Sequence, residues 1–196
     1  MDPWTDNDLL RKVEQLSDTV RRKRRFQGYS GWPRLTSGIL TVVAAVIMSR
    51  SGFPRDPVIH LFGWGAVLAI ALLLNYGALA WWFFSHAEIR QRPASIKPAL
   101  DAVPALAAGA IMSLALIFHR EYNLLFGTWM LLYGLAQTTY YGKLPAGVYG
   151  TGIIYMICGT LFLLFPQPFI NPWPMALMFV FGELAGGLCL MQPESE

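Results

Sequence analysis

A stretch without a single Asp, Glu, Lys or Arg extends from Val58 to Phe84. It is longer than the ~20 residues that an α-helix needs to cross the ~30 Å hydrocarbon core of a bilayer. Because that core offers no water, backbone N–H and C=O groups must pair within the chain, which favours a helix. Only 14% of the 196 residues are charged, whereas a soluble domain carries about 25%. The sequence therefore predicts an all-α integral membrane protein.

Similar apolar segments recur along the chain and predict a six-transmembrane-helix bundle. The predicted spans are 34–50, 57–85, 98–119, 122–141, 146–165 and 172–191. They form one transmembrane domain, residues 34–191, between a cytoplasmic segment, 1–33, and a short tail, 192–196. Six spans of about 20 residues occupy most of the chain, so no soluble domain of ordinary size remains.

The basic residues are distributed unevenly about these spans. Eight of the 15 Lys and Arg residues lie in the N-terminal segment up to Arg34. Four more fall on the same predicted side, namely Arg90, Arg92, Lys97 and Lys143. The other side holds only Arg50, Arg55 and Arg120. Because cytoplasmic loops carry the excess of Lys and Arg, we expect a multi-pass protein of the cell membrane with both termini in the cytoplasm.

The N-terminal segment is predicted to form an amphipathic helix. Leu9, Val13, Leu16 and Val20 are spaced for one helical face. A basic run follows, made of Arg21, Arg22, Lys23, Arg24 and Arg25. This helix either packs against a partner protein or a second copy, or lies on the bilayer with its basic run against anionic head groups. Residues 28–33, with two glycines and a proline, are expected to break the helix at the membrane interface.

Two further patterns concern helix packing. Stripes of small residues, such as Gly182 and Gly186, predict close approach of helices, within one bundle or between two copies. An aromatic–glycine step recurs at Tyr76-Gly77, Tyr133-Gly134 and Phe181-Gly182. It suggests three helical hairpins of common origin, although chance is an alternative because aromatic residues and glycine are abundant here.

Glu183 is an ionisable residue in the middle of a predicted span. A charge there costs about 2.5–3.5 kcal/mol on insertion scales. We therefore predict a protonated Glu183, unless a cation or a hydrated cavity supports the charged form. Either the carboxyl group is a functional site, or it joins helices by a hydrogen bond as a neutral acid. In the second case Glu183→Gln should leave both fold and function intact.

Other polar side chains are expected at similar depth. At 1.5 Å per residue, the inner halves of the spans contain Asn75, Asp101, Gln137 and Thr138. These residues either line a polar cavity that opens to the cytoplasm beneath Glu183, or make scattered hydrogen bonds between helices. The outer halves contain few polar groups apart from His60.

No catalytic motif is present with its partners. The string from Gly28 to Gly31 resembles a serine protease motif. It lies on the inner side, however, whereas His60 and His119 are expected at the outer ends of their spans, too far away to act as its base. His60 and His119 lack metal-ligand spacing, and the basic residues lie beside spans rather than on a nucleic-acid face. We therefore expect no cofactor, metal or nucleic-acid partner. The sequence favours a non-enzymatic accessory, regulatory or stress-related membrane protein. The alternative is a small transporter or channel for protons or a small polar solute that uses Glu183.

Overall fold

A computed structural model describes residues 11–12, 29–85 and 97–191. Every regular element in these ranges is a helix. They are α2 (Gly31–Met48), α3 (Pro57–Ser85), α5 (Lys97–Leu100), α6 (Val103–Phe118), the 3₁₀-helix η2 (Tyr122–Leu124), α7 (Leu125–Thr138), α8 (Ala146–Leu164) and α9 (Trp173–Met191). Apart from residues 11–12, the predicted N-terminal amphipathic helix and its basic run lie outside the described residues.

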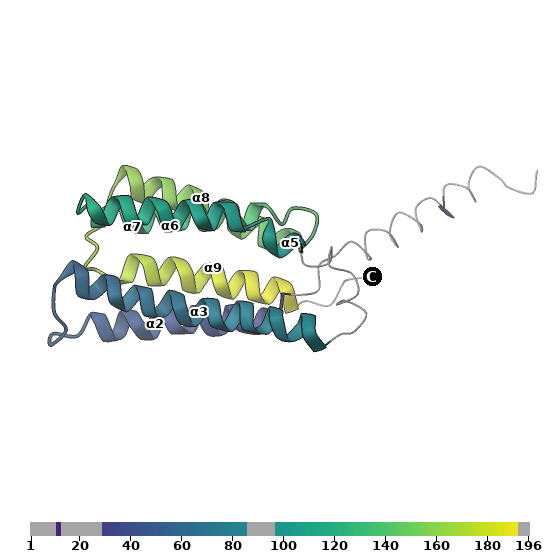
Figure 1. Cartoon of the computed structure of the whole chain (residues 1–196), viewed down its shortest axis with the longest axis horizontal. Helices are drawn as coiled ribbons and strands as arrows, with labels where there is room; N and C mark the ends of the chain where they lie inside the picture. Colours follow the sequence, from purple (N-terminus) through teal and green to yellow (C-terminus); the bar gives the residue numbers. More distant parts are fainter. Residues whose placement is uncertain (1–10, 13–28, 86–96, 192–196) are drawn as a thin grey trace, which may run out of the picture.

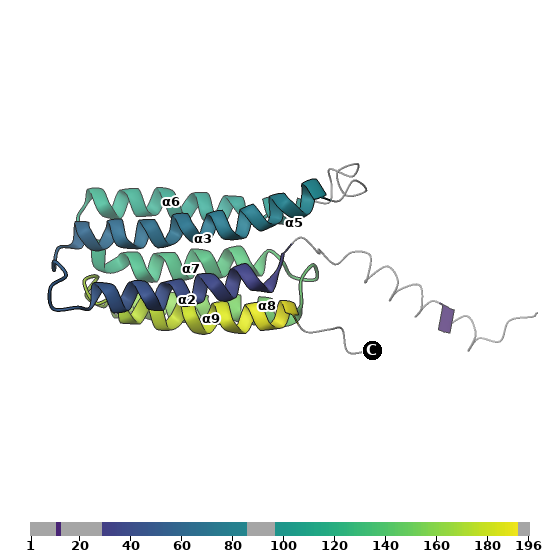
Figure 2. The same cartoon turned by 90° about the horizontal axis from the view of Figure 1, so that it is seen from below.

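The long helices run side by side and form two layers. One layer contains α2, α3 and α9, and the other contains α6, α7 and α8 (Figure 1). Successive helices run in opposite directions, so α2 begins and α9 ends at the same end of the bundle (Figure 2). We call this end of the bundle the terminal end. The opposite end, which contains the connection between α2 and α3, is called the far end.

Four helices are long and apolar enough to cross a membrane: α2, α3, α8 and α9. Helix α6 is apolar but has 16 residues, and α7 has 14. Large apolar side chains such as Phe62, Leu73 and Phe118 are exposed, whereas the side chains of Arg34 and Glu183 are buried. This distribution suits a lipid environment, because a soluble protein rarely exposes such continuous apolar surface. The chain is thus a helical protein with membrane-spanning character.

The boundaries of α3 agree with the predicted span 57–85, whereas those of α2, α6 and α7 differ. For the predicted span 122–141, η2 and α7 cover only residues 122–138. Helix α2 begins at Gly31, three residues before the predicted start of the first span, and ends at Met48, two residues before its predicted end. Pro33 occupies the first turn of α2, where its missing N–H breaks no helical hydrogen bond. The predicted span 98–119 is interrupted at residues 101–102. Pro104 explains the interruption, because a proline ring clashes with the carbonyl four residues earlier.

Glycines bring the backbones of α7 and α8 into contact. A Cβ atom at Gly134 would lie 2.6 Å from the carbonyl oxygen of Gly152, and one at Gly159 would lie 2.9 Å from that of Gly127. Close approach through small residues is how membrane helices gain packing energy. The most closely packed helix pairs are α7 with α8 and α2 with α9. Each pair joins helices from different predicted hairpins.

The aromatic–glycine positions of the suggested repeat have unlike surroundings. Gly134 and Gly182 face closely packed neighbours, whereas a Cβ atom at Gly77 would meet nothing within 4 Å. The three positions therefore do not share one structural role, and a common origin of the hairpins stays a hypothesis.

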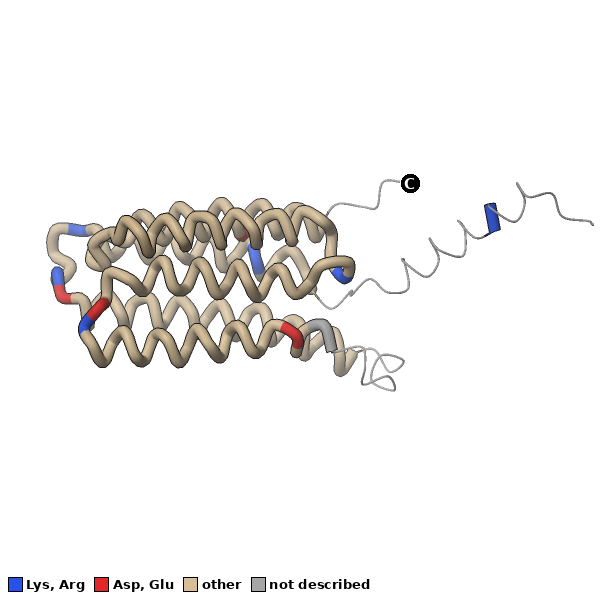
Figure 3. Tube along the Cα trace, turned by 90° about the horizontal axis from the view of Figure 1, so that it is seen from above, with Lys and Arg blue, Asp and Glu red and all other residues tan. Residues whose placement is uncertain are grey.

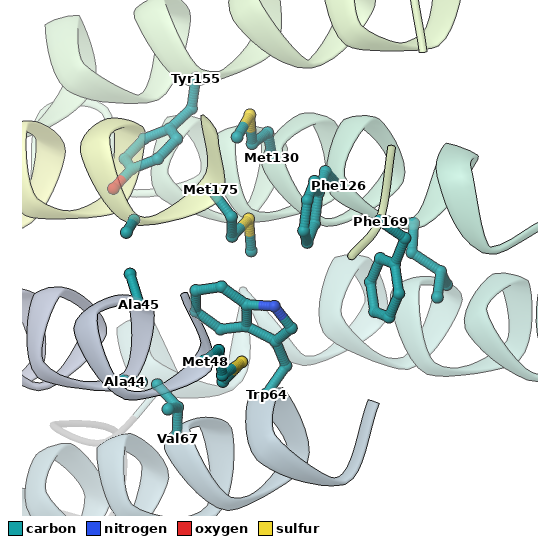
Figure 4. Close-up of a cluster of buried hydrophobic side chains, with 12 residues drawn as sticks. Ala44, Ala45, Met48, Trp64, Val67, Phe126, Met130, Tyr155, Phe169 and Met175 are labelled. Atoms are coloured by element: carbon teal, nitrogen blue, oxygen red, sulfur yellow. The ribbon is translucent and has the colours of Figure 1, made fainter. Parts of the chain in front are cut away.

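The far end of the bundle contains an apolar core. Trp64 packs edge-on against Phe126, with ring centroids 5.9 Å apart, and Phe126 lies 4.9 Å from Phe169. Met130 and Met175 fill the adjacent space (Figure 4). This far-end core closes the half of the bundle in which the sequence shows few polar groups.

Candidate functional site

Glu183 forms a buried ion pair with Arg34. Helix α9 carries Glu183, and the first turns of α2 carry Arg34, 149 positions earlier in the chain. Arg34 Nε donates to Glu183 Oε2 at 2.9 Å, and Arg34 Nη2 donates to Oε1 at 3.0 Å. Two parallel charge-assisted bonds of this kind are the strongest arrangement available to an arginine and a carboxylate. Glu183 is 3% exposed and Arg34 is 7% exposed, so the pair lies inside the bundle.

Helices α7 and α8 supply the neutral partners of this pair. Tyr133 donates its hydroxyl hydrogen to Glu183 Oε1 at 2.7 Å. Gln137 Oε1 accepts a hydrogen bond from Arg34 Nη2 at 3.1 Å and lies 2.8 Å from the hydroxyl of Thr151. We call these five residues the polar centre. Its members come from α2, α7, α8 and α9, so hydrogen bonds cross from one layer of the bundle to the other.

Glycines in α9 make room for the polar centre. A Cβ atom at Gly186 would lie 2.6 Å from Arg34 Cζ, so a glycine at this position is required for the guanidinium to lie where it does. At Gly182, one turn earlier, a Cβ atom would overlap the ring of Tyr155. The small residues that the sequence marks as a packing stripe therefore accommodate side chains of the polar centre and its surroundings.

Arg34 extends into the bundle rather than towards the membrane surface. Gly38, one turn farther along α2, lies opposite Glu183, since a Cβ atom there would be 3.1 Å from Glu183 Cβ. The guanidinium lies between Glu183 and the position of Gly186, so it stays inside the interface of α2 and α9. Arginines near helix ends usually extend outward to keep the charge hydrated. Here the carboxylate, a tyrosine and an amide replace that hydration.

Ion pairs elsewhere among the described residues lie nearer the surface. Figure 3 shows charged residues gathered at the two ends of the bundle, with few along its length. Lys143 pairs with Asp101 at the terminal end, and these side chains are 36% and 29% exposed. The Arg34–Glu183 pair is therefore distinguished by its burial.

The structure brings together only part of the predicted intramembrane set. Gln137 belongs to the polar centre with Glu183, as the sequence suggested. Asp101 pairs with Lys143 instead, and Thr138 bonds to the carbonyl oxygen of Leu135 in its own helix at 2.7 Å. Asn75 donates to Ser37 on α2 at 3.2 Å and to Ala71 at 2.9 Å. These three residues make local or pairwise contacts and do not extend the polar centre.

Three members of the polar centre are not among the intramembrane site residues predicted from the sequence: Arg34, Tyr133 and Thr151. Arg34 is counted with the cytoplasmic basic residues because it is the first residue of the predicted span 34–50. A partial signal for it exists in the sequence: a mid-span carboxylate requires a donor, and Arg34 adjoins one end of the apolar stretch 35–49, although Arg50 adjoins the other end. A charged Glu183 requires a cation or a hydrated cavity beside it, and the Arg34 guanidinium is such a cation.

The remaining sequence predictions concern metals and the basic run. Among the described residues, no group of three or more His, Cys, Asp or Glu side chains could hold a metal ion. The predicted lipid or partner contact through Arg21–Arg25 lies outside the described residues.

Comparison of the chain with protein families, curated proteins and solved structures finds no match. The class defined by fold and site is a helical protein with membrane-spanning character and an ion pair buried between its layers. Its function has to be inferred from the polar centre and its surroundings.

Proposed function

We propose that this chain is a non-enzymatic, six-span membrane protein with an accessory or regulatory role, in which the polar centre is a structural clamp. The observation that carries the proposal is the saturation of Glu183 by the chain's own donors. Oε1 accepts bonds from Arg34 and Tyr133, and Oε2 accepts one from Arg34. A carboxylate occupied in this way has little capacity left for a proton or a transported cation.

The far-end core gives independent support for a structural role. Trp64, Phe126, Phe169, Met130 and Met175 fill the bundle between the polar centre and the far end. A transported polar solute would need hydrogen-bonding groups along that route, because unpaired polar groups are costly in an apolar environment. The packing supports a closed bundle, and contact with a lipid, a partner or a second copy is left to the basic N-terminal helix.

The count of six spans rests on the arrangement of the two shorter helices. Helices α6 and α7 lie alongside α8 in one layer (Figure 1). Helices α5 and α6 form the helical stretch 97–118, which is interrupted at residues 101–102. The second stretch, residues 122–138, is formed by η2 and α7. At 1.5 Å per residue the second of these is about 25 Å long, close to the thickness of the hydrocarbon core.

Orientation is the first testable part of this proposal. We expect reporter fusions at Lys143 and after Glu196 to be cytoplasmic, because of the excess of basic residues on that side. Fusions at Arg55, Arg120 and Gln167 should report the opposite side. A cytoplasmic reporter at Gln167 would contradict the six-span arrangement. The predicted span 146–165 separates Lys143 from Gln167, and it would then not cross the membrane.

A transporter or channel is the second candidate, and one observation favours it. The side-chain amide nitrogen of Gln137 is buried and has no hydrogen-bond partner among the described residues. Its oxygen faces Arg34, which fixes the orientation of the amide. An unpaired buried donor costs about 1–3 kcal/mol, so a water molecule or a small solute beside Gln137 would be favourable.

Flux measurements separate the two candidates. The full chain is reconstituted in liposomes, and proton and cation flux are compared with those of protein-free liposomes and of Arg34→Leu/Glu183→Leu. The double substitution removes both charges without leaving either one unpaired. We expect all three preparations to have the same permeability. Flux that is present in the wild type and lost in the double variant would overturn the structural proposal and establish transport through the polar centre.

A further inference from the structure

The far end of the bundle has basic residues that the orientation rule leaves unexplained. Arg50 and Arg55 lie in the connection between α2 and α3, and Arg120 lies between α6 and η2. None of the three forms an ion pair within the described part of the chain. The nearby carboxylate of Asp56 accepts a hydrogen bond from the backbone N–H of Val58 at 2.7 Å, which caps the start of α3. Two of these arginines share a cavity.

A cavity of about 310 Å³ opens at this end between two connections of the chain. One wall is the stretch from Met48 to Arg55, including both arginines, and the other is the stretch from Pro168 to Pro172. The volume suits a phosphate group with part of the molecule that carries it. Two arginines without carboxylate partners make the cavity electropositive, and guanidinium groups bind phosphate through paired hydrogen bonds.

His60 contributes a polar group at the base of this cavity. The residue is 1% exposed, and its ring packs edge-on against Phe53 at a centroid distance of 5.1 Å. The carbonyl of Pro54 approaches the imidazole, but Nδ1 has no hydrogen-bond partner among the described residues. An unpaired nitrogen in a buried and rigidly packed ring is costly. Because the other ring nitrogen faces the Pro54 carbonyl as donor, Nδ1 of the neutral ring is an acceptor, and a head-group hydroxyl in the cavity would supply the hydrogen bond it lacks.

An apolar surface continues from the cavity along α2. Arg50 also lines a second hollow, together with Ile47 and Phe53. Below it, Ile39, Val43 and Ile47 are exposed and spaced four residues apart, so they form one stripe along the helix. A free phosphate ion would use only the cavity, whereas a phospholipid would use the cavity for its head group and the stripe for an acyl chain.

We propose that Arg50 and Arg55 bind the phosphate of an anionic phospholipid at the far end of the bundle, that His60 accepts a hydrogen bond from a hydroxyl of its head group, and that an acyl chain lies along Ile39, Val43 and Ile47. The site is separate from the polar centre and from the basic N-terminal run, and it lies at the level where α2 leaves the apolar part of the bundle. A lipid at this position would connect the loop before α3 with the loop before α9.

The proposal is tested on the full-length protein in detergent, by titration with a fluorescent phosphatidylglycerol. Arg50→Gln/Arg55→Gln removes both guanidinium groups, and because these side chains are exposed the fold should tolerate the change. Each basic residue near a lipid head group contributes about fivefold in affinity, so we expect the double variant to bind at least about tenfold more weakly. Arg120→Gln is the matched control, since Arg120 is an unpaired arginine at the same end that does not line the cavity. Equal affinity of the double variant and the control would overturn the proposal.

Two further arms identify the source of the phosphate. Phosphatidylcholine, which has no net charge, should compete poorly, and Val43→Asn/Ile47→Asn should weaken phosphatidylglycerol binding through the apolar stripe. Inorganic phosphate at millimolar concentration should not displace the lipid. Displacement by inorganic phosphate, together with unchanged binding in the Asn variant, would identify a small-anion site and overturn the assignment to a phospholipid.

Discussion

Arg34→Leu is expected to lower the free energy of unfolding by about 3–5 kcal/mol, the usual cost of removing one partner of a buried ion pair. The substitution leaves the Glu183 carboxylate without its cation at a position that is 3% exposed. It also removes the donor to Gln137 Oε1. The measurement is reversible unfolding of the purified protein in mixed detergent, with helix content as the readout.

The reciprocal and double variants show whether the cost comes from the unpaired charge. Glu183→Gln preserves size and hydrogen bonding, and would be harmless if Glu183 were a neutral acid. Because the structure pairs it with Arg34, we instead expect a loss similar to that of Arg34→Leu. Arg34→Leu/Glu183→Leu should recover a large part of the stability, since neither charge is then left alone.

The ion pair of Lys143 and Asp101 provides the matched control. It also pairs a cationic side chain with a carboxylate, but its side chains are about one third exposed. Lys143→Met should therefore cost no more than about 1 kcal/mol. A loss as large as that of Arg34→Leu would show that burial is not the reason for the importance of the Arg34 pair. A stable Glu183→Gln would instead restore the neutral-acid interpretation.

Gly186→Leu is expected to destabilise the protein by at least about 3 kcal/mol, because it combines overpacking with displacement of a buried ion pair. Even a Cβ atom at this position would lie 2.6 Å from Arg34 Cζ and 2.8 Å from both Nη atoms. The guanidinium would have to leave Glu183 and Gln137. Thermal unfolding in detergent, followed by intrinsic tryptophan fluorescence, measures the loss.

Gly77→Leu is the control for this substitution. Gly77 lies within α3, and a Cβ atom there would meet nothing within 4 Å, so a leucine side chain should be tolerated in contact with lipid. The coupling to Arg34 is tested in the Arg34→Ala background, where space for the leucine is available. Gly186→Leu should cost much less there than in the wild type. An unchanged cost would place the clash elsewhere, for instance on the α2 backbone.

The helices themselves follow from the sequence to a large extent. The charge-free stretch that predicts a span at 57–85 matches α3 at both ends, and α8 and α9 end within one residue of their predicted limits. Such agreement is expected because an apolar stretch of this length has few alternatives in a bilayer. The turn before α6 is less visible in the pattern, since Pro104 acts on local backbone geometry and leaves the hydropathy unchanged.

The partner of Glu183 was decided by tertiary structure. Composition shows that a mid-span carboxylate needs support, but Arg34 lies 149 positions away and is adjacent only because α2 packs antiparallel to α9. Which helices become neighbours depends on complementary shapes, such as the space above Gly186 that receives the guanidinium. Hydropathy is a property of each helix alone and carries no information on this choice. The sequence by itself therefore determined that a carboxyl group lies in the middle of an apolar span, and only the packing of helices distant in the chain determined that a guanidinium is paired with it.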